Sequence, residues 1–257
     1  NAMNLDALSL SILGPAFLAG ILVLATHVPL GVQVLGRGIV FIDLAIAQVA
    51  GLGVVIADRL GFAPQGWGVE VAAVAAALAA ALLLTWTEKR WPEVQEATIG
   101  VLFALAASLG LLLMAGDPHG GEHLKDLLVG QILWVSYGQL APVALFSALI
   151  LAAWFGLGAR LGRMGFYVLF AFAVTVSVQL VGVYLVFSSL IVPALATRRL
   201  AGRTRLAAAY ALGVAAYGAG LALSALFDFP SGAVIVLALV GLALPLHALG
   251  PKVGQET

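Results

Sequence analysis

Long apolar runs separated by short polar turns make up almost the whole chain of 257 residues. A helix needs about 20 apolar residues to cross the hydrocarbon core of a bilayer, which is about 30 Å thick. The apolar runs fall at residues 8–35, 38–57, 68–87, 97–115, 139–158, 165–181, 183–197, 205–226 and 232–249. The sequence therefore predicts an all-α integral membrane protein, a polytopic helical bundle of about nine transmembrane helices.

Two stretches depart from this simple spacing. Residues 166–197 are too long for one span and short for two, and Gly182 lies at the expected break, so we predict two short or tilted helices. Residues 127–136 are apolar, but about ten residues cannot cross alone, which predicts a re-entrant or interfacial helix. Residues 1–3 look like a tag remnant followed by the starting methionine, which leaves 4–257 as a single transmembrane domain.

The composition excludes several classes of protein. Hydrophobic residues make up 63% of the chain and charged residues 9%, whereas soluble domains are about half apolar and a quarter charged. This excess of hydrophobic residues argues against a soluble enzyme or a secreted module. The chain has no cysteine, which excludes disulfides and thiolate metal sites, and its net charge of zero gives no electrostatic basis for binding nucleic acid.

Lysine and arginine accumulate in cytoplasmic loops, so their positions predict the orientation of the bundle. If the helices alternate in direction, ten of the 12 basic residues fall on one side: Arg37, Lys89, Arg90, Arg160, Arg163, Arg198, Arg199, Arg203, Arg205 and Lys252. Arg59 and Lys125 fall on the other side. We therefore expect the N-terminus outside and the C-terminus inside, which agrees with an odd number of crossings.

Few polar side chains lie inside the predicted spans, where ionisable groups are costly. Asp43 and His27 are the two ionisable residues well inside a span, and Gln48 is a neutral polar neighbour. In a hairpin that turns at residues 37–38, His27 and Gln48 lie at matching depth, whereas Asp43 is rotated about 140° from Gln48. Their nitrogen and oxygen atoms suit zinc, manganese or iron. Alternatively, His27 and Asp43 hydrogen-bond backbone groups freed by Pro29 and the glycines, or anchor helix ends.

A second cluster of candidate metal ligands lies in a predicted outer loop at residues 116–126. His119, Glu122 and His123 provide two imidazoles and a carboxylate for capturing a metal ion at the mouth of a pore. The glycines at 120–121 disfavour a regular helical site, so an ordinary polar turn is the alternative interpretation.

Motifs for ATP hydrolysis and covalent catalysis are missing. The chain has no Gly-x4-Gly-Lys-Ser/Thr phosphate loop, nucleophile elbow or zinc-protease helix. We therefore do not expect an enzyme, and the energy for any transport must come from an ion gradient or from a partner subunit.

Several segments, taken in chain order, resemble the membrane permease subunit of the ABC-type zinc/manganese/iron importer family. They are PLGVQVLGR at 29–37, VFID at 40–43, EATIGVLF at 96–103, LLVGQILWVS at 127–136, VGVYLVFSSLIVPALATR at 181–198 and FDFPSGA at 227–233. Together they span most of the chain. The ordered set, more than any single motif, carries the resemblance.

The resemblance implies a homodimeric import permease in the bacterial cytoplasmic (inner) membrane. It implies that an extracytoplasmic binding protein delivers a divalent metal ion, with zinc the first expectation and manganese or iron the alternatives. Two cytoplasmic ATPase subunits would bind ATP, and the permease itself would hold no permanent cofactor. By the same match, residues 196–205 would form a coupling helix on the ATPase, with Thr197, Arg198, Arg199, Arg203 and Arg205. The positive-inside rule alone also explains this charge.

The chain departs from the family pattern in one respect. The family usually carries Asp-x-x-x-His in its second helix, whereas Leu-Ala-Ile-Ala follows Asp43 here and Gln48 stands about where the histidine would be. We hypothesise that His27, from the neighbouring helix, replaces the missing imidazole.

Three other functions remain open from the sequence. The related cobalamin and siderophore permeases share a late Gly-x-x-Gly and Pro-x-Gly region but are longer, with about ten helices. An ion-coupled secondary metal transporter should show inverted repeats and paired carboxylates at the midplane, and neither is evident. A purely structural scaffold would need neither Asp43 nor an ATPase.

Overall fold

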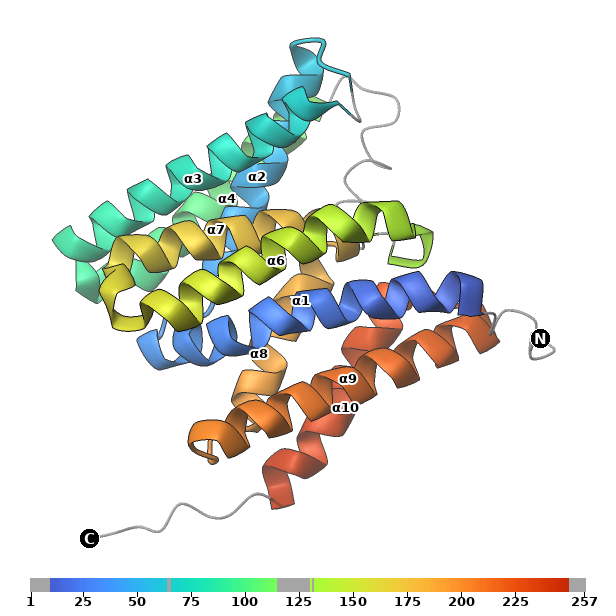
Figure 1. Ribbon diagram of the computed structural model, residues 1–257. Helices are drawn as coiled ribbons and strands as arrows, with labels where there is room; N and C mark the ends of the chain where they lie inside the picture. The colour runs from blue at the N-terminus through green and yellow to red at the C-terminus, as the bar shows by residue number, and fades with distance from the viewer. Residues whose placement is uncertain (1–9, 64–65, 115–129, 131, 250–257) are drawn as a thin grey trace, which may run out of the picture. The chain divides into compact units, whose positions relative to one another are not determined.

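The computed structural model describes residues 10–63, 66–114, 130 and 132–249 (Figure 1). Its α-helices are α1 (Leu10–Arg37), α2 (Ile42–Arg59), α3 (Trp67–Arg90), α4 (Gln95–Met114), α6 (Tyr137–Leu157), α7 (Gly162–Val181), α8 (Val183–Ala196), α9 (Gly202–Phe227) and α10 (Ser231–Leu249). Short 3-10 helices are η2 (Pro92–Val94), η3 (Ile132–Trp134) and η4 (Gly158–Leu161). These described residues contain no strand, which confirms the all-helical fold class, and each predicted apolar run overlaps one α-helix.

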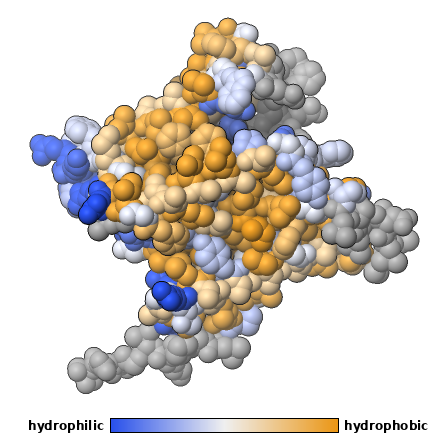
Figure 2. Space-filling model, viewed as in Figure 1, coloured by the Kyte–Doolittle hydropathy of each residue, from blue (hydrophilic) through white to orange (hydrophobic). Residues whose placement is uncertain are grey.

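Six of the described helices are long and apolar enough to cross a membrane: α1, α3, α4, α6, α7 and α9. Helix α2 has 18 residues but carries Asp43, Asp58 and Arg59, and α8 has only 14 residues. Most of the surface visible in Figure 2 is hydrophobic, as expected where helices face lipid. The count of nine crossings and the orientation of the termini therefore stay predictions.

The chain folds into two compact units, each built from segments distant in sequence. The first unit contains the described parts of Asn1–Arg37, Val129–Ser147 and Leu180–Thr257, and therefore α1, η3, the start of α6, α8, α9 and α10. The second contains the described parts of Gly38–Leu128 and Ala148–Gln179, and therefore α2, α3, α4, the rest of α6 and most of α7. One boundary between the units thus coincides with the turn from α1 to α2.

Small residues bring the helices of the first unit into close contact. Helix α1 packs against α8 and α9, and α10 packs against the same two helices. A Cβ atom at Gly31 of α1 would overlap the backbone of Leu190 in α8, and one at Gly220 of α9 would overlap Ile235 in α10. These glycines let the helix backbones approach closely, which is typical of packing between membrane helices.

In the second unit, α2 packs against both α3 and α4. Buried hydrogen bonds hold the corner between α3 and α4. Thr87 Oγ1 donates to Gln95 Oε1 over 2.9 Å, and Gln95 Nε2 donates to the carbonyl oxygen of Leu84 over 3.0 Å. The same Nε2 also donates to the hydroxyl of Tyr167 over 3.2 Å. These bonds satisfy the polar atoms of Gln95, which is only 4% exposed, so the corner is well defined.

Glycines with a positive φ lie at two breaks between helices. The predicted break at Gly182 is confirmed: α7 ends at Val181, Gly182 has φ +79° and α8 begins at the next residue. Gly38, which follows α1, has φ +71°. Such backbone conformations are readily adopted by glycine alone. In the apolar stretch at 127–136, residues 132–134 form η3, whose position in a membrane stays a prediction.

Candidate functional site

Asp43 is a buried acidic residue in the first turn of α2, with 1% of its surface exposed. Its carboxylate interacts with the backbone N–H groups of Asp43 and Leu44, and the positive end of the helix dipole favours a negative charge there. Within the described residues, however, neither oxygen has a hydrogen-bond partner of good geometry. Burying an unpaired carboxylate costs folding free energy, so stability alone does not explain this side chain.

Gln48 lies further along the same helix and is also buried, with 8% of its surface exposed. Five positions on an ideal helix correspond to a rotation of about 140° relative to Asp43. Both side chains are nevertheless buried, because α2 is covered by α3 as well as by α4. The second unit thus provides one carboxylate and one amide as candidate oxygen ligands.

A second carboxylate, Glu96 in the first turn of α4, meets the start of α2. Its Oε1 accepts a hydrogen bond from the backbone N–H of Phe41 over 3.3 Å. Phe41 precedes α2 and makes no side-chain cap hydrogen bond, and Glu96 binds the backbone N–H of Phe41 itself from another helix. Glu96 Oε2 is buried without a hydrogen-bond partner among the described residues. The sequence predicts no role for Glu96, because the 55 residues that separate it from Phe41 leave no local signal.

His27 lies in α1 and is completely buried, at 0% exposure. Its Nδ1 lies 2.9 Å from the carbonyl oxygen of Val23 and 3.0 Å from the hydroxyl of Thr26. Because a carbonyl can only accept, Nδ1 carries the proton and donates, which leaves a lone pair on Nε2. Nε2 has no hydrogen-bond partner within the described part of the chain. A neutral imidazole oriented by a backbone carbonyl is a common form of metal ligand.

The backbone carbonyl that Pro29 leaves without a partner in α1 is hydrogen-bonded by a tyrosine of another helix. Proline has no N–H, so the carbonyl of Ala25 loses its usual partner inside α1. Tyr210 of α9 donates its hydroxyl to this carbonyl over 2.9 Å. His27 hydrogen-bonds the backbone carbonyl of Val23 instead, so a purely structural role for this histidine and a role in metal transport both stay open.

The candidate metal ligands belong to separate parts of the molecule. Asp43 and Gln48 lie in the second unit and His27 in the first, so a site shared by all three stays a prediction. The outer candidates His119, Glu122 and His123 lie outside the described residues.

The basic segment 196–205 differs from the coupling helix that the resemblance implies. Ala196 ends α8, a turn follows, and Gly202 already begins α9, so the segment is not a helix of its own. Thr197 is buried at the end of α8, where its hydroxyl donates to the carbonyl oxygen of Pro193 over 2.8 Å. This bond fixes the point at which the chain leaves α8.

The arginines of this segment differ in exposure. Arg198 and Arg203 are exposed, whereas Arg199 and Arg205 are half-buried. Arg205 Nη2 donates to the carbonyl oxygen of Ala194 over 3.3 Å and so links the start of α9 to the end of α8. Exposed charge on an anchored turn can contact another molecule. A role in contacting an ATPase remains a proposal.

Comparison with known proteins identifies the family. The ABC 3 transport family matches residues 9–157 and 151–249. The chain is 29% identical to the manganese transport system membrane protein MntC of Halalkalibacterium halodurans, covering 97% of this chain and 91% of that protein. It is 26% identical to the high-affinity zinc uptake system membrane protein ZnuB of Haemophilus influenzae, covering 88% of this chain and 93% of that protein.

A solved structure has the same fold. PsaBC from Streptococcus pneumoniae in complex with Fab aligns with a TM-score of 0.76 at 22% identity, and the alignment covers 93% of this chain and 92% of that chain. The resemblance stated from the sequence motifs is therefore confirmed, and the chain belongs to the ABC 3 transport family.

Proposed function

We propose that this chain is the permease subunit of an ATP-driven importer that moves a divalent metal ion into the cytoplasm. The observation that carries the proposal is Asp43, whose carboxylate is buried and lacks a hydrogen-bond partner of good geometry among the described residues. Burying this carboxylate lowers the stability of the fold. In a protein of a metal-transport family, the best explanation is that the carboxylate binds the cation during transport.

The chemistry of the candidate ligands supports a transition metal as the cargo. Asp43 and Gln48 offer oxygen atoms, and His27 offers the lone pair of Nε2. Imidazole suits zinc and iron, and carboxylate suits manganese, so zinc remains the first expectation with manganese and iron as alternatives. The relatives named above include one manganese and one zinc protein, in keeping with this range.

The partners we propose are those of a complete importer in the bacterial inner membrane. Two permeases form a homodimer, an extracytoplasmic binding protein delivers the metal ion, and two ATPase subunits bind the cytoplasmic face. The exposed guanidinium group of Arg203 supports a docking role for the basic segment. ATP is hydrolysed on the partner subunits.

The test measures metal content by mass spectrometry in cells that express the permease with its candidate ATPase and binding protein. We expect one of zinc, manganese or iron to accumulate selectively, and only when all three proteins are present and the ATPase is active. Accumulation without the ATPase would instead indicate a secondary transporter. An intact complex that hydrolyses ATP but accumulates no bare metal ion would indicate a metal-chelate cargo.

The role of His27 is tested by paired substitutions. His27→Asn removes the lone pair at the position of Nε2, whereas His27→Gln can offer an amide oxygen further along the side chain. We expect His27→Asn to lower accumulation about tenfold, the scale typical of a weakened metal site, and His27→Gln to retain more. Unchanged uptake and unchanged metal preference in both variants would remove His27 from the metal path.

A further inference from the structure

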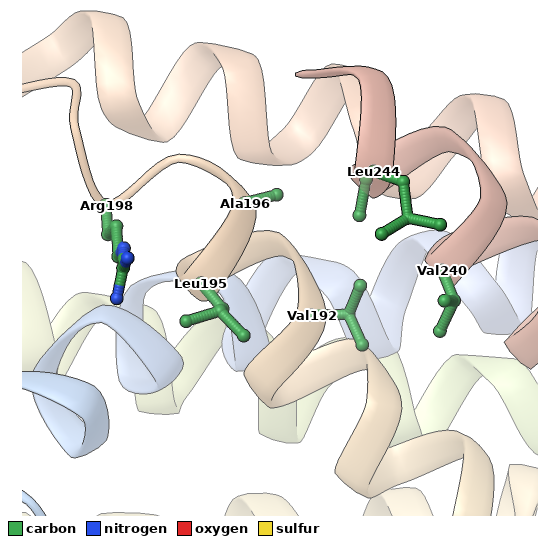
Figure 3. Close-up of a pocket in the computed structure, with 7 residues that line it drawn as sticks. Val192, Leu195, Ala196, Arg198, Val240 and Leu244 are labelled. Carbon is green, nitrogen blue, oxygen red and sulfur yellow. The ribbon is translucent and has the colours of Figure 1, made fainter. Parts of the chain in front are cut away.

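A groove of about 340 Å³ lies between the end of α8 and α10 in the first unit (Figure 3). Its walls are apolar: Val192 and Leu195 come from α8, and Val240 and Leu244 from α10. In Figure 3, Val192 and Ala196 face Val240 and Leu244 across the groove. This volume is near the lower end of the range of about 300–1,000 Å³ that is typical of small-ligand pockets.

The groove is open to the surroundings and has a charge at one end. Leu244 is 66% exposed, Val240 42% and Leu195 41%, so apolar side chains face outward along its length. Arg198 lines the end of the groove just beyond α8, and its side chain is exposed. An exposed apolar groove that ends in a cation fits a molecule with an apolar chain and an anionic head.

We propose that this groove binds an anionic phospholipid, with one acyl chain between α8 and α10 and the phosphate paired with Arg198. Guanidinium groups bind phosphate oxygens through paired hydrogen bonds, which gives the headgroup a defined position. Basic pockets between membrane helices on the cytoplasmic side are typical sites for anionic lipids. The site goes beyond the proposed import function and does not rest on it.

The charge and size of the groove favour a lipid over a protein partner. The basic side chain lies at one end only, at the boundary of the apolar helix, which matches the division of a phospholipid into head and chain. A contact in which two copies of this chain met at this end of the groove would bring their Arg198 side chains together, and these like charges would repel each other.

The experiment measures lipid retention by native mass spectrometry on the purified full chain in detergent. It compares phosphatidylglycerol with phosphatidylethanolamine carrying the same acyl chains. We expect preferential retention of phosphatidylglycerol, and about fivefold weaker retention of it in Arg198→Gln. Phosphatidylethanolamine should lose less, because its ammonium group offsets the charge of its phosphate. Ala243→Phe, which fills the groove, should lower retention of both lipids. Arg203→Gln is the matched control, because Arg203 is an exposed arginine of the same segment that does not line the groove.

Three results would overturn the proposal. Equal retention of both lipids by the unmodified chain would show that Arg198 selects no headgroup. Equal effects of Arg198→Gln and Arg203→Gln would show general attraction to a basic surface. Loss of dimers in Ala243→Phe with unchanged lipid retention would show that a second copy occupies the groove. Because Arg198 is an exposed surface residue, its variant should fold even where the groove-filling variant does not.

Discussion

Replacing Asp43 by asparagine is expected to abolish metal accumulation without lowering the thermal stability of the permease. The native carboxylate is 1% exposed and lacks a hydrogen-bond partner of good geometry among the described residues, so its charge is costly to bury. Asparagine has nearly the same size but carries no charge. A transported cation therefore loses its negatively charged ligand, whereas the folded protein loses an unfavourable group.

The experiment measures metal accumulation and the apparent melting temperature of the detergent-purified complex in parallel. We expect accumulation to fall by at least about tenfold, because the side chain lost would be a direct ligand, and removing an outer-shell group already costs 10–100-fold in metal affinity. Asp58→Asn is the matched control, since Asp58 is an exposed carboxylate at the other end of the same helix. This control should leave both quantities unchanged.

The two readings together separate a functional role from a structural one. A fall in the melting temperature of Asp43→Asn would indicate that the carboxylate holds α2 in place, for example through its backbone N–H contacts at the helix start. Retained accumulation would remove Asp43 from the metal path. The expected combination is typical of a residue that is maintained for function at the expense of stability.

The helices could be predicted because the length of an apolar run is a strong signal. A stretch that is too long for one span and short for two has to break, and Gly182 is the residue that allows the necessary positive φ. Helix α8 has only 14 residues and could still be placed, because the preceding glycine fixes its start. Hydrophobicity does not say, however, how many of these helices cross the bilayer.

The site was only partly predictable because its contacts join residues far apart in the chain. Asp43 and His27 stood out as costly groups inside apolar runs. The bond from Tyr210 to Ala25 spans 185 positions, and the bond from Phe41 to Glu96 spans 55. No local pattern indicates such pairs. The orientation of the His27 ring likewise depends on a carbonyl that only the folded helix places beside Nδ1.

Replacing Gly130 by alanine is expected to destabilise the first unit, because a strained backbone conformation and a steric overlap coincide at this residue. Gly130 has φ +69°, a conformation that costs a residue with a Cβ atom about 1–2 kcal/mol. A Cβ atom there would also overlap the backbone of Val181 and Gly182 at the break between α7 and α8. Overpacking adds about 1–3 kcal/mol, and backbone atoms cannot rotate away as a side chain can.

Two other glycines separate these costs. Gly61 has φ +85° with no atom near its missing Cβ, so Gly61→Ala measures the backbone cost alone. Gly241 lies inside α10 with open space around it, and Gly241→Ala should be neutral or slightly stabilising, because alanine favours helix. Apparent melting temperatures of the purified chain in one detergent should therefore rank Gly130→Ala lowest, Gly61→Ala intermediate and Gly241→Ala highest.

The size of the gap between the first two variants measures how rigid the break between α7 and α8 is. If the backbone at Gly182 can shift, it relieves the overlap, and Gly130→Ala melts close to Gly61→Ala. If α8 is held firmly by its contacts with α1, α9 and α10, the overlap persists and the chain loses stability through both costs. We expect the second result, because the close approach of Gly31 to Leu190 leaves α8 little room to move away.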